Sequence, residues 1–493
     1  MLRAPLFDGK FKLYRKIDRE TFLSYNIVMT KQEKTEKTFV RLIQDGYKLT
    51  DSYFQLEIKK ATSLETIPTV LGLDHLTGTR FKDFYVDTHK VRDVNTIAVL
   101  EKKLKTPLIP YIKLLFSGFN GAGKTTELIR LFSRLRNVFD VIIFSAISRL
   151  RIDELSAEAL LFEIAEDVLK YIHSNNLFAE DSSGTELKHI ISDLIDWCYD
   201  KKIIKEKEIR KDKSIGFGLQ FLKGIFFNAK FERNLSGTQR TEFTYEAERN
   251  LRDLIVKCNA LFDYLKKKTG KDALIIIDDL EKMNFMSARN FHVHNSHFLR
   301  DLKCKMVLTV PVELIYHVDY SLIQNVFGEA KVLPMIKIKD INGNPFKEGI
   351  DCLTEILSRR LDLSLFENEC YKKAIMYSGG SIRELFNIIE NAVFYEDESM
   401  IKSSTMDKSI LQFKDTFAQR IQERNDEIKI SFEEYLNVLF EIDDGNKAAP
   451  KKTIALLDLL RTRSVMKYNG EGFYDTHPLL DSFIANHRKR IKR

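Results

Sequence analysis

Short apolar runs alternate with longer amphipathic segments through the middle of the chain. The strand-like runs lie at 111–118, 140–147, 272–282, 304–314 and 333–340. The segments 124–136 and 152–173 carry hydrophobic residues at helical spacing. Strands that alternate with helices are typical of a parallel sheet covered by helices. The pattern therefore predicts an α/β core with a parallel sheet of five strands.

The pattern changes on both sides of this core and once inside it. Residues 81–89 read as a short strand that leads into the core. Residues 174–270 interrupt the alternation with charged helical segments and, within 215–231, an expected hairpin of alternating aromatic residues. From about 341 onward the pattern is mostly helical, and near the end a turn signal predicts a hairpin over 464–475.

The composition is that of an ordinary globular protein. The 493 residues suggest roughly three domains, with 44% hydrophobic and 30% charged residues. No run approaches the ~18 apolar residues of a membrane helix, and the start has no apolar leader, so we expect a cytoplasmic protein without membrane insertion. The five cysteines form no CxxC pair, which fits a reducing compartment and disfavours a zinc site or a disulfide framework.

The charge is mildly positive, with one strongly basic segment. A net charge of +7 on this length does not require a nucleic-acid partner. The last seven residues, HRKRIKR, contain Arg488, Lys489, Arg490, Lys492 and Arg493 and no acid. Two interpretations stay open for them: contact with nucleic-acid phosphates, or a solvated helix end whose cations complement the helix dipole.

A glycine-rich turn follows the first predicted strand of the core. Residues 118–125 match G-x-x-x-x-G-K-[ST] in full, between a strand-like and a helix-like segment. Glycines at 121 and 123 let backbone amides wrap a phosphate, Lys124 can reach the β- and γ-phosphates, and Thr125 can ligate Mg²⁺. The residues expected to contact ATP are Gly118, Asn120, Gly121, Ala122, Gly123, Lys124, Thr125 and Thr126. Lys124 also counts among the catalytic candidates.

Paired acids follow a strand that is apolar over 273–277. A nucleotide site of this kind needs a carboxylate at the tip of a neighbouring strand, and buried acids are costly unless a cation neutralises them. We expect Asp278 to serve the Mg²⁺ ion and Asp279 to orient or activate the attacking water, with Glu281 able to do so less directly. The alternative is that Asp279 and Glu281 only cap the next helix.

The order of these motifs resembles an AAA+ ATPase, and within that group the origin-recognition and STAND branches. The tetrad DDLE stands where the origin-recognition type has D-E-x-D, and Thr309 falls at the sensor 1 position. Residues 355–361 resemble the first lid helix, and 378–393 resemble the sensor 2 helix. The resemblance implies that Thr309 and Arg383 sense the γ-phosphate; the alternative is a surface arginine in an ordinary helix.

The sensor 2 segment also has a helix start of its own. Ser381 and Glu384 have the spacing of a capping box after two glycines, and the apolar residues that follow recur on one face. A helix that begins there would hold Arg383 rigidly in its first turn.

The C-terminal part resembles a winged-helix domain, with the predicted hairpin as its wing. The segment 476–484 resembles the closing helix of bacterial STAND-type ATPases. The resemblance thus implies an N-terminal region of unknown role (1–107), an ATPase core (108–340) with the insertion 174–270, a helical lid (341–403) and a winged-helix-like domain (404–493). Winged helices bind DNA in the origin-recognition branch and often lock the closed, ADP-bound state in STAND proteins.

The chain departs from ring-forming AAA+ motors at one position. These motors place an arginine finger between the sensor 1 strand and the last strand, but the corresponding segment 313–333 contains no arginine. Because such an arginine contributes about 10³–10⁵ in rate, its absence predicts slow turnover. Arg300, Arg359 and Arg360 are the available substitutes, and none lies at the expected place in the sequence. Asp279 in place of the usual glutamate also shortens the reach to the water.

Three histidines, His292, His294 and His297, follow the acidic pair. Their spacing spreads them over different faces of a helix, so we do not expect a metal site there. The functional expectation is a slowly hydrolysing, ATP- and Mg²⁺-dependent conformational switch, associated by family with sensing or anti-phage defence. An oligomeric motor and an ATP-loaded DNA-binding protein remain the alternatives. DNA binding through the C-terminal domain and assembly into a homo-oligomer stay open.

Overall fold

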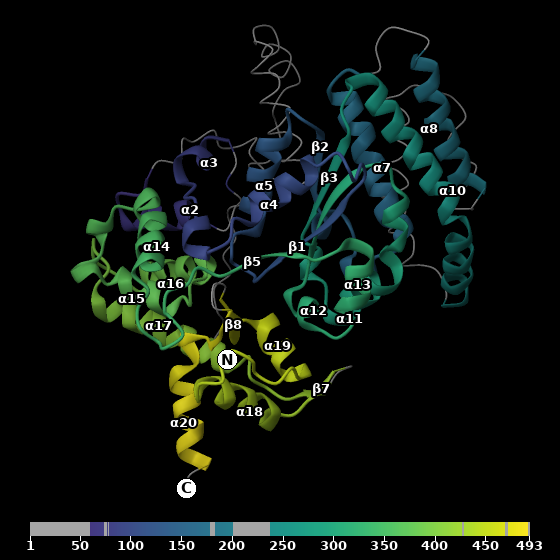
Figure 1. Cartoon of the computed structure of the whole chain (residues 1–493). Coiled ribbons are helices and arrows are strands. Elements are labelled where there is room, and N and C mark those ends of the chain that lie inside the picture. The colour runs from purple at the N-terminus through teal and green to yellow at the C-terminus, as the bar shows by residue number, and fades with distance from the viewer. Residues whose placement is uncertain are drawn as a thin grey trace, which may run out of the picture.

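The computed structural model describes residues 60–72, 76, 78–177, 183–200, 237–425, 428–468 and 472–491 (Figure 1). The expected hairpin within 215–231, the tip of the hairpin over 464–475 and the last two basic residues lie outside the described residues. Within them, no helix combines the length and the apolar composition that crossing a membrane requires.

A parallel sheet forms the centre of the molecule. Its strands are β1 (Lys113–Gly118), β2 (Asp140–Ser145), β3 (Ala273–Asp278), β4 (Lys305–Val310) and β5 (Lys331–Leu333). They pair in parallel in the order β2-β3-β4-β1-β5. The first four strands are buried along their whole length, as parallel strands covered on both faces must be. The predicted α/β class is confirmed.

Alternate residues of these strands belong to two separate hydrophobic cores. Leu114 and Phe116 of β1 pack with helices α4 (Thr96–Lys105) and α5 (Lys124–Leu135), whereas Leu115 packs on the opposite face. On that face lie α7 (Ala157–Ser174), α8 (Ser183–Asp200) and the 33-residue α10 (Gly237–Thr269), stacked side by side in Figure 1. The described part of the insertion is therefore helical, as the sequence predicts, and it thickens one face of the sheet.

The fifth strand is shorter and earlier than the sequence pattern predicts. We expected it at 333–340, but Lys331–Leu333 pairs with Phe116, Ser117 and Gly118 of β1. Pro334 follows directly, and a proline has no N–H to donate to the next ladder position. The apolar residues after it, Met335 and Ile336, are buried as an irregular segment instead.

Residues 81–89 do not form the expected strand. They belong to helix α3 (Gly78–Phe84) and to the turn before the 3₁₀ helix η3 (His89–Arg92). The aromatic residues here have helical spacing, because the rings of Phe81 and Tyr85 stack with their centroids 4.6 Å apart. The prediction of a strand over 81–89 is therefore wrong, because the aromatic residues lie on one face of a helix.

The helices after the sheet form a layer that faces the start of the described chain. They are α14 (Lys347–Arg360), α15 (Tyr371–Tyr377), α16 (Ile382–Phe394) and α17 (Ser403–Ala418), with η10 (Leu363–Leu365) and η11 (Glu367–Glu369) between them. The elements η2 (Leu64–Thr66) and α2 (Ile67–Leu71) pack beside α16, and α3 packs on α14. The backbone of Ala61 bonds to both Arg360 and Asp362. The described residues before the core, from residue 60 onward, thus join the helical layer rather than standing apart.

The C-terminal part is a helical unit with two small hairpins. It contains α18 (Phe432–Asp443), α19 (Ile454–Thr462), η12 (Pro478–Leu480) and α20 (Asp481–Ile491). The hairpins are β6 (Arg424–Asn425) with β7 (Lys429–Ile430) and β8 (Val465–Lys467) with β9 (Tyr474–Thr476), the second as the sequence predicts. Helix α19 packs against helix α12 (Val312–Tyr316) of the core, and η12 packs against α17.

Short helices connect the remaining elements. After β2 come α6 (Ala146–Arg149) and η4 (Ile152–Glu154). After β3 come η7 (Leu280–Lys282), α11 (Phe285–Arg289), a π-helix η8 (Asn290–Asn295) and η9 (Ser296–Asp301). After β4 come α12 (Val312–Tyr316) and α13 (Tyr320–Phe327). All three groups follow the carboxyl ends of strands, which is where a parallel α/β sheet places its ligand site.

Candidate nucleotide-binding site

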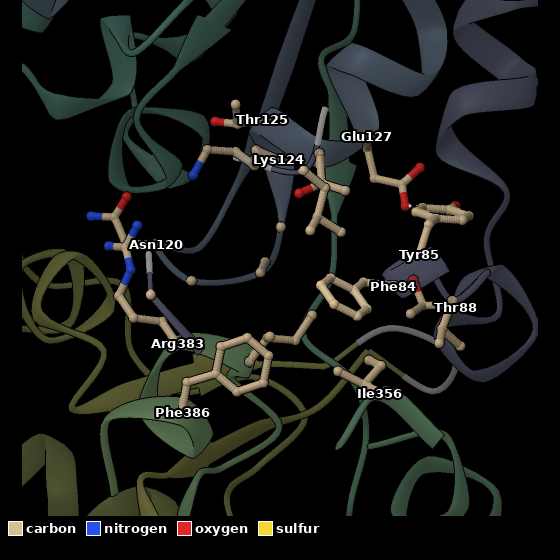
Figure 2. Close-up of a pocket in the computed structure, with 18 of the residues that line it drawn as sticks. Phe84, Tyr85, Thr88, Asn120, Lys124, Thr125, Glu127, Ile356, Arg383 and Phe386 are labelled. Atoms are coloured by element: carbon tan, nitrogen blue, oxygen red, sulfur yellow. Dashed lines mark hydrogen bonds between the residues drawn. The ribbon is translucent and has the colours of Figure 1, made fainter. Parts of the chain in front are cut away.

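A cleft opens between the glycine-rich loop, the segment 70–92 and the helices α14 and α16 (Figure 2). Its volume is about 1110 Å³ including the open mouth. One side is formed by the loop itself, over residues 120–126, together with the acids after β3. The opposite side, which we call the apolar end, is lined by Val70, Leu76, Phe84, Val86, Ile356 and Phe386. A cleft with one polar and one apolar side suits a nucleotide.

The glycine-rich loop has the backbone that a phosphate cradle needs. Gly121 and Gly123 have φ angles of 84° and 91°, which residues with a side chain rarely adopt. A Cβ atom on Gly121 would lie 2.6 Å from the hydroxyl oxygen of Ser381 and 2.8 Å from Cβ of Arg383. The loop therefore rests directly against the start of α16, and only glycine allows this approach.

The amino group of Lys124 lies between the loop and the acids after β3. Its Nζ donates to the carbonyl oxygens of Gly118 (2.9 Å) and Phe119 (3.2 Å) and lies 3.1 Å from Oε1 of Glu281. The side chain is only 5% exposed. A cation at the first turn of a helix that follows a loop of inward-facing amides favours bound phosphate.

Thr125 and Asp278 meet although the strands that lead to them, β1 and β3, are not neighbours in the sheet. The Thr125 hydroxyl donates to Oδ2 of Asp278 at 2.5 Å, across β4, which lies between β1 and β3. We expected the acidic strand to adjoin β1, and this was wrong by one strand. Burial, with Glu281 and Asp279 nearby, raises the pKa of Asp278 above its usual range.

These groups fit a magnesium ion. Carboxylate atoms of Asp278, Asp279 and Glu281 lie within 4.8 Å of one another, and all three residues are buried. Hydroxyl and carboxylate oxygens are the ligands that Mg²⁺ prefers, and a cation would offset the crowding of negative charge that raises the Asp278 pKa. Thr125 and Asp278 are the side chains placed to hold it.

The two other acids have different partners. Asp279 adopts a left-handed backbone (φ 69°), accepts a hydrogen bond from Ser145 at the end of β2, and lies 2.7 Å from Lys282 Nζ. Its side chain makes no helix-capping bond, contrary to the capping alternative. Glu281 pairs with Lys124 through Oε1, while its buried Oε2 has no hydrogen-bond partner. The geometry therefore gives Glu281 a more direct place beside Lys124 than the sequence suggested.

Thr309 does not line the cleft. It is fully buried, and its hydroxyl accepts from the backbone N–H of Leu280 (2.9 Å) and donates to the carbonyl of Ile277 (3.4 Å). The hydroxyl thus supports the turn that carries the acids rather than facing a ligand. Its assignment as a γ-phosphate sensor remains a prediction, and in this arrangement it would act through that turn.

Arg383 lies directly beside the glycine-rich loop. It occupies the first turn of α16 and lines the cleft, with its guanidinium on the same side as the Lys124 amino group (Figure 2). Only half of the expected capping box forms: the Ser381 hydroxyl accepts from the Glu384 N–H, but the Ser381 N–H donates to Ser378. The Glu384 carboxylate instead accepts a hydrogen bond from the Ser381 hydroxyl through Oε2 and lies 2.7 Å from Arg463 Nη1 through Oε1.

Arg463 makes contacts with α16 and the glycine-rich loop that the sequence analysis did not predict. It follows α19 in the C-terminal part, and its Nη1 lies 2.7 Å from Glu384 Oε1 and 3.4 Å from the carbonyl oxygen of Asn120 in the glycine-rich loop. Arg463 and Glu384 are both largely buried. One arginine thus joins the C-terminal part, α16 and the loop, and only its position after a predicted helix could have singled it out.

Arg92 is a second residue that the sequence analysis missed. It is 3% exposed and donates to the carbonyl of Ala122 at 2.7 Å, to the carbonyl of Pro334 and to the Thr88 hydroxyl at 2.8 Å. Arg92 therefore connects the backbone of the glycine-rich loop to the backbone that directly follows β5. Its sequence surroundings carry only an N-cap signal, Asn95 before α4, which says nothing about the loop.

The remaining candidates lie away from the phosphate side. Arg360 lines the apolar end, whereas Arg359 bonds to Tyr85 and Glu355, and Arg300 does not line the cleft. His292 is fully buried, and burial lowers its pKa to about 3. Within the parts of the chain that the structure describes, no group of potential metal ligands includes a histidine.

Comparisons with known proteins find similarity only among solved structures. No family model matches the chain. No curated protein matches it either. The Orc1 protein of Aeropyrum pernix, solved in complex with DNA, is 12% identical with a TM-score of 0.37, over 85% of this chain and 97% of that chain. A Walker-type ATPase of Pyrococcus abyssi is 13% identical with a TM-score of 0.41, over 84% of this chain and 99% of that chain. Cdc6p of Pyrobaculum aerophilum is 11% identical with a TM-score of 0.36, over 86% of this chain and 98% of that chain.

Proposed function

We propose that this chain is an AAA+/STAND-like ATPase that binds ATP with Mg²⁺, hydrolyses it slowly and uses it as a conformational switch. The proposal keeps the division into an N-terminal region, an ATPase core, a lid and a winged-helix-like domain. What supports nucleotide binding is the glycine-rich loop with Lys124 and Thr125, joined to Asp278 by a hydrogen bond. A biological role in sensing or anti-phage defence rests on family association alone.

The proposed roles follow from the contacts. Lys124 exchanges the loop carbonyls and Glu281 for phosphate oxygens. Thr125 and Asp278 would hold the metal, which would neutralise charge on the bound phosphates. Glu281 is then released from Lys124 and orients the attacking water, with Asp279 as the alternative base. Arg383, fixed in the first turn of α16, contacts the γ-phosphate.

The observation that supports a conformational switch is the contact of Arg463 with Glu384 and with the glycine-rich loop. The C-terminal part reaches the glycine-rich loop and, through Glu384, the helix that bears Arg383. Because phosphate binding changes the charge and position of these same groups, the nucleotide and the C-terminal part are energetically coupled at one point. The lack of any arginine in 313–333 adds the expectation of slow turnover, since this segment supplies no finger to a neighbouring subunit.

The DNA-binding alternative is not favoured by this arrangement. Helix α19, which precedes the larger hairpin, packs against α12 of the core, so its face is not free to enter a DNA groove. Arg488 of the basic tail lies 2.9 Å from Asp443 and 2.5 Å from Asp444 at the end of α18. Arg488 is thus already paired within the chain, at the end of a helix, as the interpretation of the tail as a solvated helix end allows.

ATP turnover measured against protein concentration, with and without duplex DNA, tests the proposal. We expect turnover below one per second that changes little with either variable and is abolished in Lys124→Ala. Turnover of several per second that rises with concentration would instead indicate an oligomeric motor. Stimulation by DNA that falls steeply with salt would indicate the DNA-binding alternative. Normal turnover in Lys124→Ala would overturn the nucleotide assignment itself.

A further inference from the structure

The apolar end of the cleft is the place left for a nucleotide base. If phosphates occupy the glycine-rich loop, as the proposed function requires, the rest of the nucleotide extends toward Phe84, Ile356 and Phe386, which face the loop across the cleft (Figure 2). These side chains offer flat and apolar surface to a planar ring. They provide no polar group that could recognise the edge of the base.

Arginines supply the polar groups at this end. Arg360 is committed to structure: its Nη1 donates to the carbonyl oxygens of Phe84 and Ile356, each at 3.0 Å. Its guanidinium lies 5.3 Å from the Phe84 ring centroid and 5.2 Å from that of Phe386. Burial, with the nearby charges of Arg80 and Arg359, lowers the pKa of Arg360 to about 10.

Arg80, on α3, has no such commitment. It lines the cleft, and its Nε atom is buried without a hydrogen-bond partner. No residue of the described chain forms an ion pair with it. The acceptor side chains along this wall are already engaged, because Glu127 accepts from Tyr85 and pairs with Arg130, and Thr88 accepts from Arg92. Arg80 thus brings to the cleft wall a guanidinium that the described residues leave without an acceptor, which indicates that a ligand provides one.

We propose that Arg80 donates a hydrogen bond to a ring nitrogen of the base of a bound purine nucleotide and so fixes how the base sits in the cleft. Purines present unprotonated ring nitrogens on their edges, and a guanidinium is a donor without acceptor capacity. The neighbouring Phe84 and Phe386 would hold the ring, and Arg80 would fix its orientation. The inference deepens the proposed nucleotide site and depends on it.

Analogues of ATP that lack one ring nitrogen test this directly. Binding of ATP, 1-deaza-ATP, 3-deaza-ATP and 7-deaza-ATP is measured by calorimetry for the full chain, for Arg80→Met and for Lys82→Met. We expect one analogue to bind the unsubstituted protein about tenfold more weakly than ATP, since one hydrogen bond to a charged donor is lost. In Arg80→Met all four ligands should bind alike, at that weaker level.

Lys82→Met is the matched control, because Lys82 is an exposed cation on the same helix and does not line the cleft. It should discriminate as the unsubstituted protein does. Arg80→Gln, which keeps a polar side chain, serves if Arg80→Met fails to fold. Equal binding of all four ligands to the unsubstituted protein would overturn the proposal, as would a discrimination that persists in both Arg80 variants. Failure of the unsubstituted protein to bind ATP, or unchanged binding in Lys124→Ala, would instead overturn the nucleotide site.

Discussion

The two sides of the cleft are built in different ways. The phosphate side comes from consecutive residues, 118–126, with the acids after β3, and its geometry follows from a strand, a tight turn and a helix start. The apolar end is assembled from α3, α14 and α16, segments separated by more than half of the chain. Contact with phosphate therefore depends on local backbone shape, whereas contact with the base depends on how distant helices pack.

This difference teaches where the site should be fragile. Substitutions on the phosphate side should remove a function while leaving the fold, because the loop geometry is set by its own glycines. Substitutions at the apolar end should change affinity and lid packing together, since the same side chains do both. The four predictions below run from the largest expected effect to the smallest.

The largest contrast should appear in nucleotide binding. We expect Lys124→Ala to weaken ATP binding by about 100-fold or more, because a buried charged donor to the phosphates is lost, and Phe386→Ala by only about tenfold, because apolar contact area is lost. Calorimetry with ATP measures both. Thermal melting without nucleotide should show the reverse order of damage. Equal losses of affinity would remove the distinction between the two sides.

The second contrast lies within the phosphate side, between the carboxylates of Glu281 and Asp279. Glu281→Gln should lower turnover by about 100-fold or more while ATP still binds, because its carboxylate lies beside Lys124 with one oxygen unpartnered. Asp279→Asn should have a smaller effect, since Asp279 is held by Ser145 and Lys282. Single-turnover hydrolysis with separately measured binding checks this. A larger loss in Asp279→Asn would make Asp279 the base.

The third prediction concerns the link from the C-terminal part to the phosphate side. Arg463→Ala leaves the buried Glu384 carboxylate without a cation, with the Ser381 hydroxyl still bonded to it, so the C-terminal part should detach more easily and ADP should dissociate about tenfold faster. Stopped-flow release of a fluorescent ADP measures the rate. Arg488→Ala is the control, because Arg488 pairs with Asp443 and Asp444 inside the C-terminal part. Equal rates in the two variants would show that Arg463 couples nothing.

The smallest effect should be a pH dependence at the α12–α19 contact. Burial raises the pKa of Glu313 from 4.5 to about 7, although Arg461 and Lys124 nearby oppose the shift. Between pH 4.5 and pH 7 the Glu313 carboxyl of the folded protein holds a proton that the unfolded chain releases. The stability of the fold therefore falls as the pH rises toward 7. Glu313→Gln should therefore melt about 2 °C higher than the unsubstituted protein at pH 8 and nearly equally at about pH 4, below the pKa of the unfolded chain. A difference that does not change with pH would contradict this.

The sequence predicted what depends on neighbours along the chain. Lys124 begins α5 and Asp278 ends β3 as expected, because both positions follow from strand ends and turn chemistry. The strand order, with β4 between β1 and β3, depends on crossovers that periodicity does not encode. Arg92 and Arg463 escaped notice because a buried arginine looks like any surface arginine until its carbonyl or carboxylate partner is known.

The packing of α19 on α12 has a consequence for any partner of the C-terminal part. A protein or nucleic acid that binds the covered face of α19 can do so only in the opened molecule, in which Arg463 no longer touches the glycine-rich loop. Thermodynamic reciprocity then requires that such a partner weaken the retained nucleotide by the same factor by which the nucleotide weakens the partner. A ligand could thus be recognised by the ADP that it releases, before its identity is known.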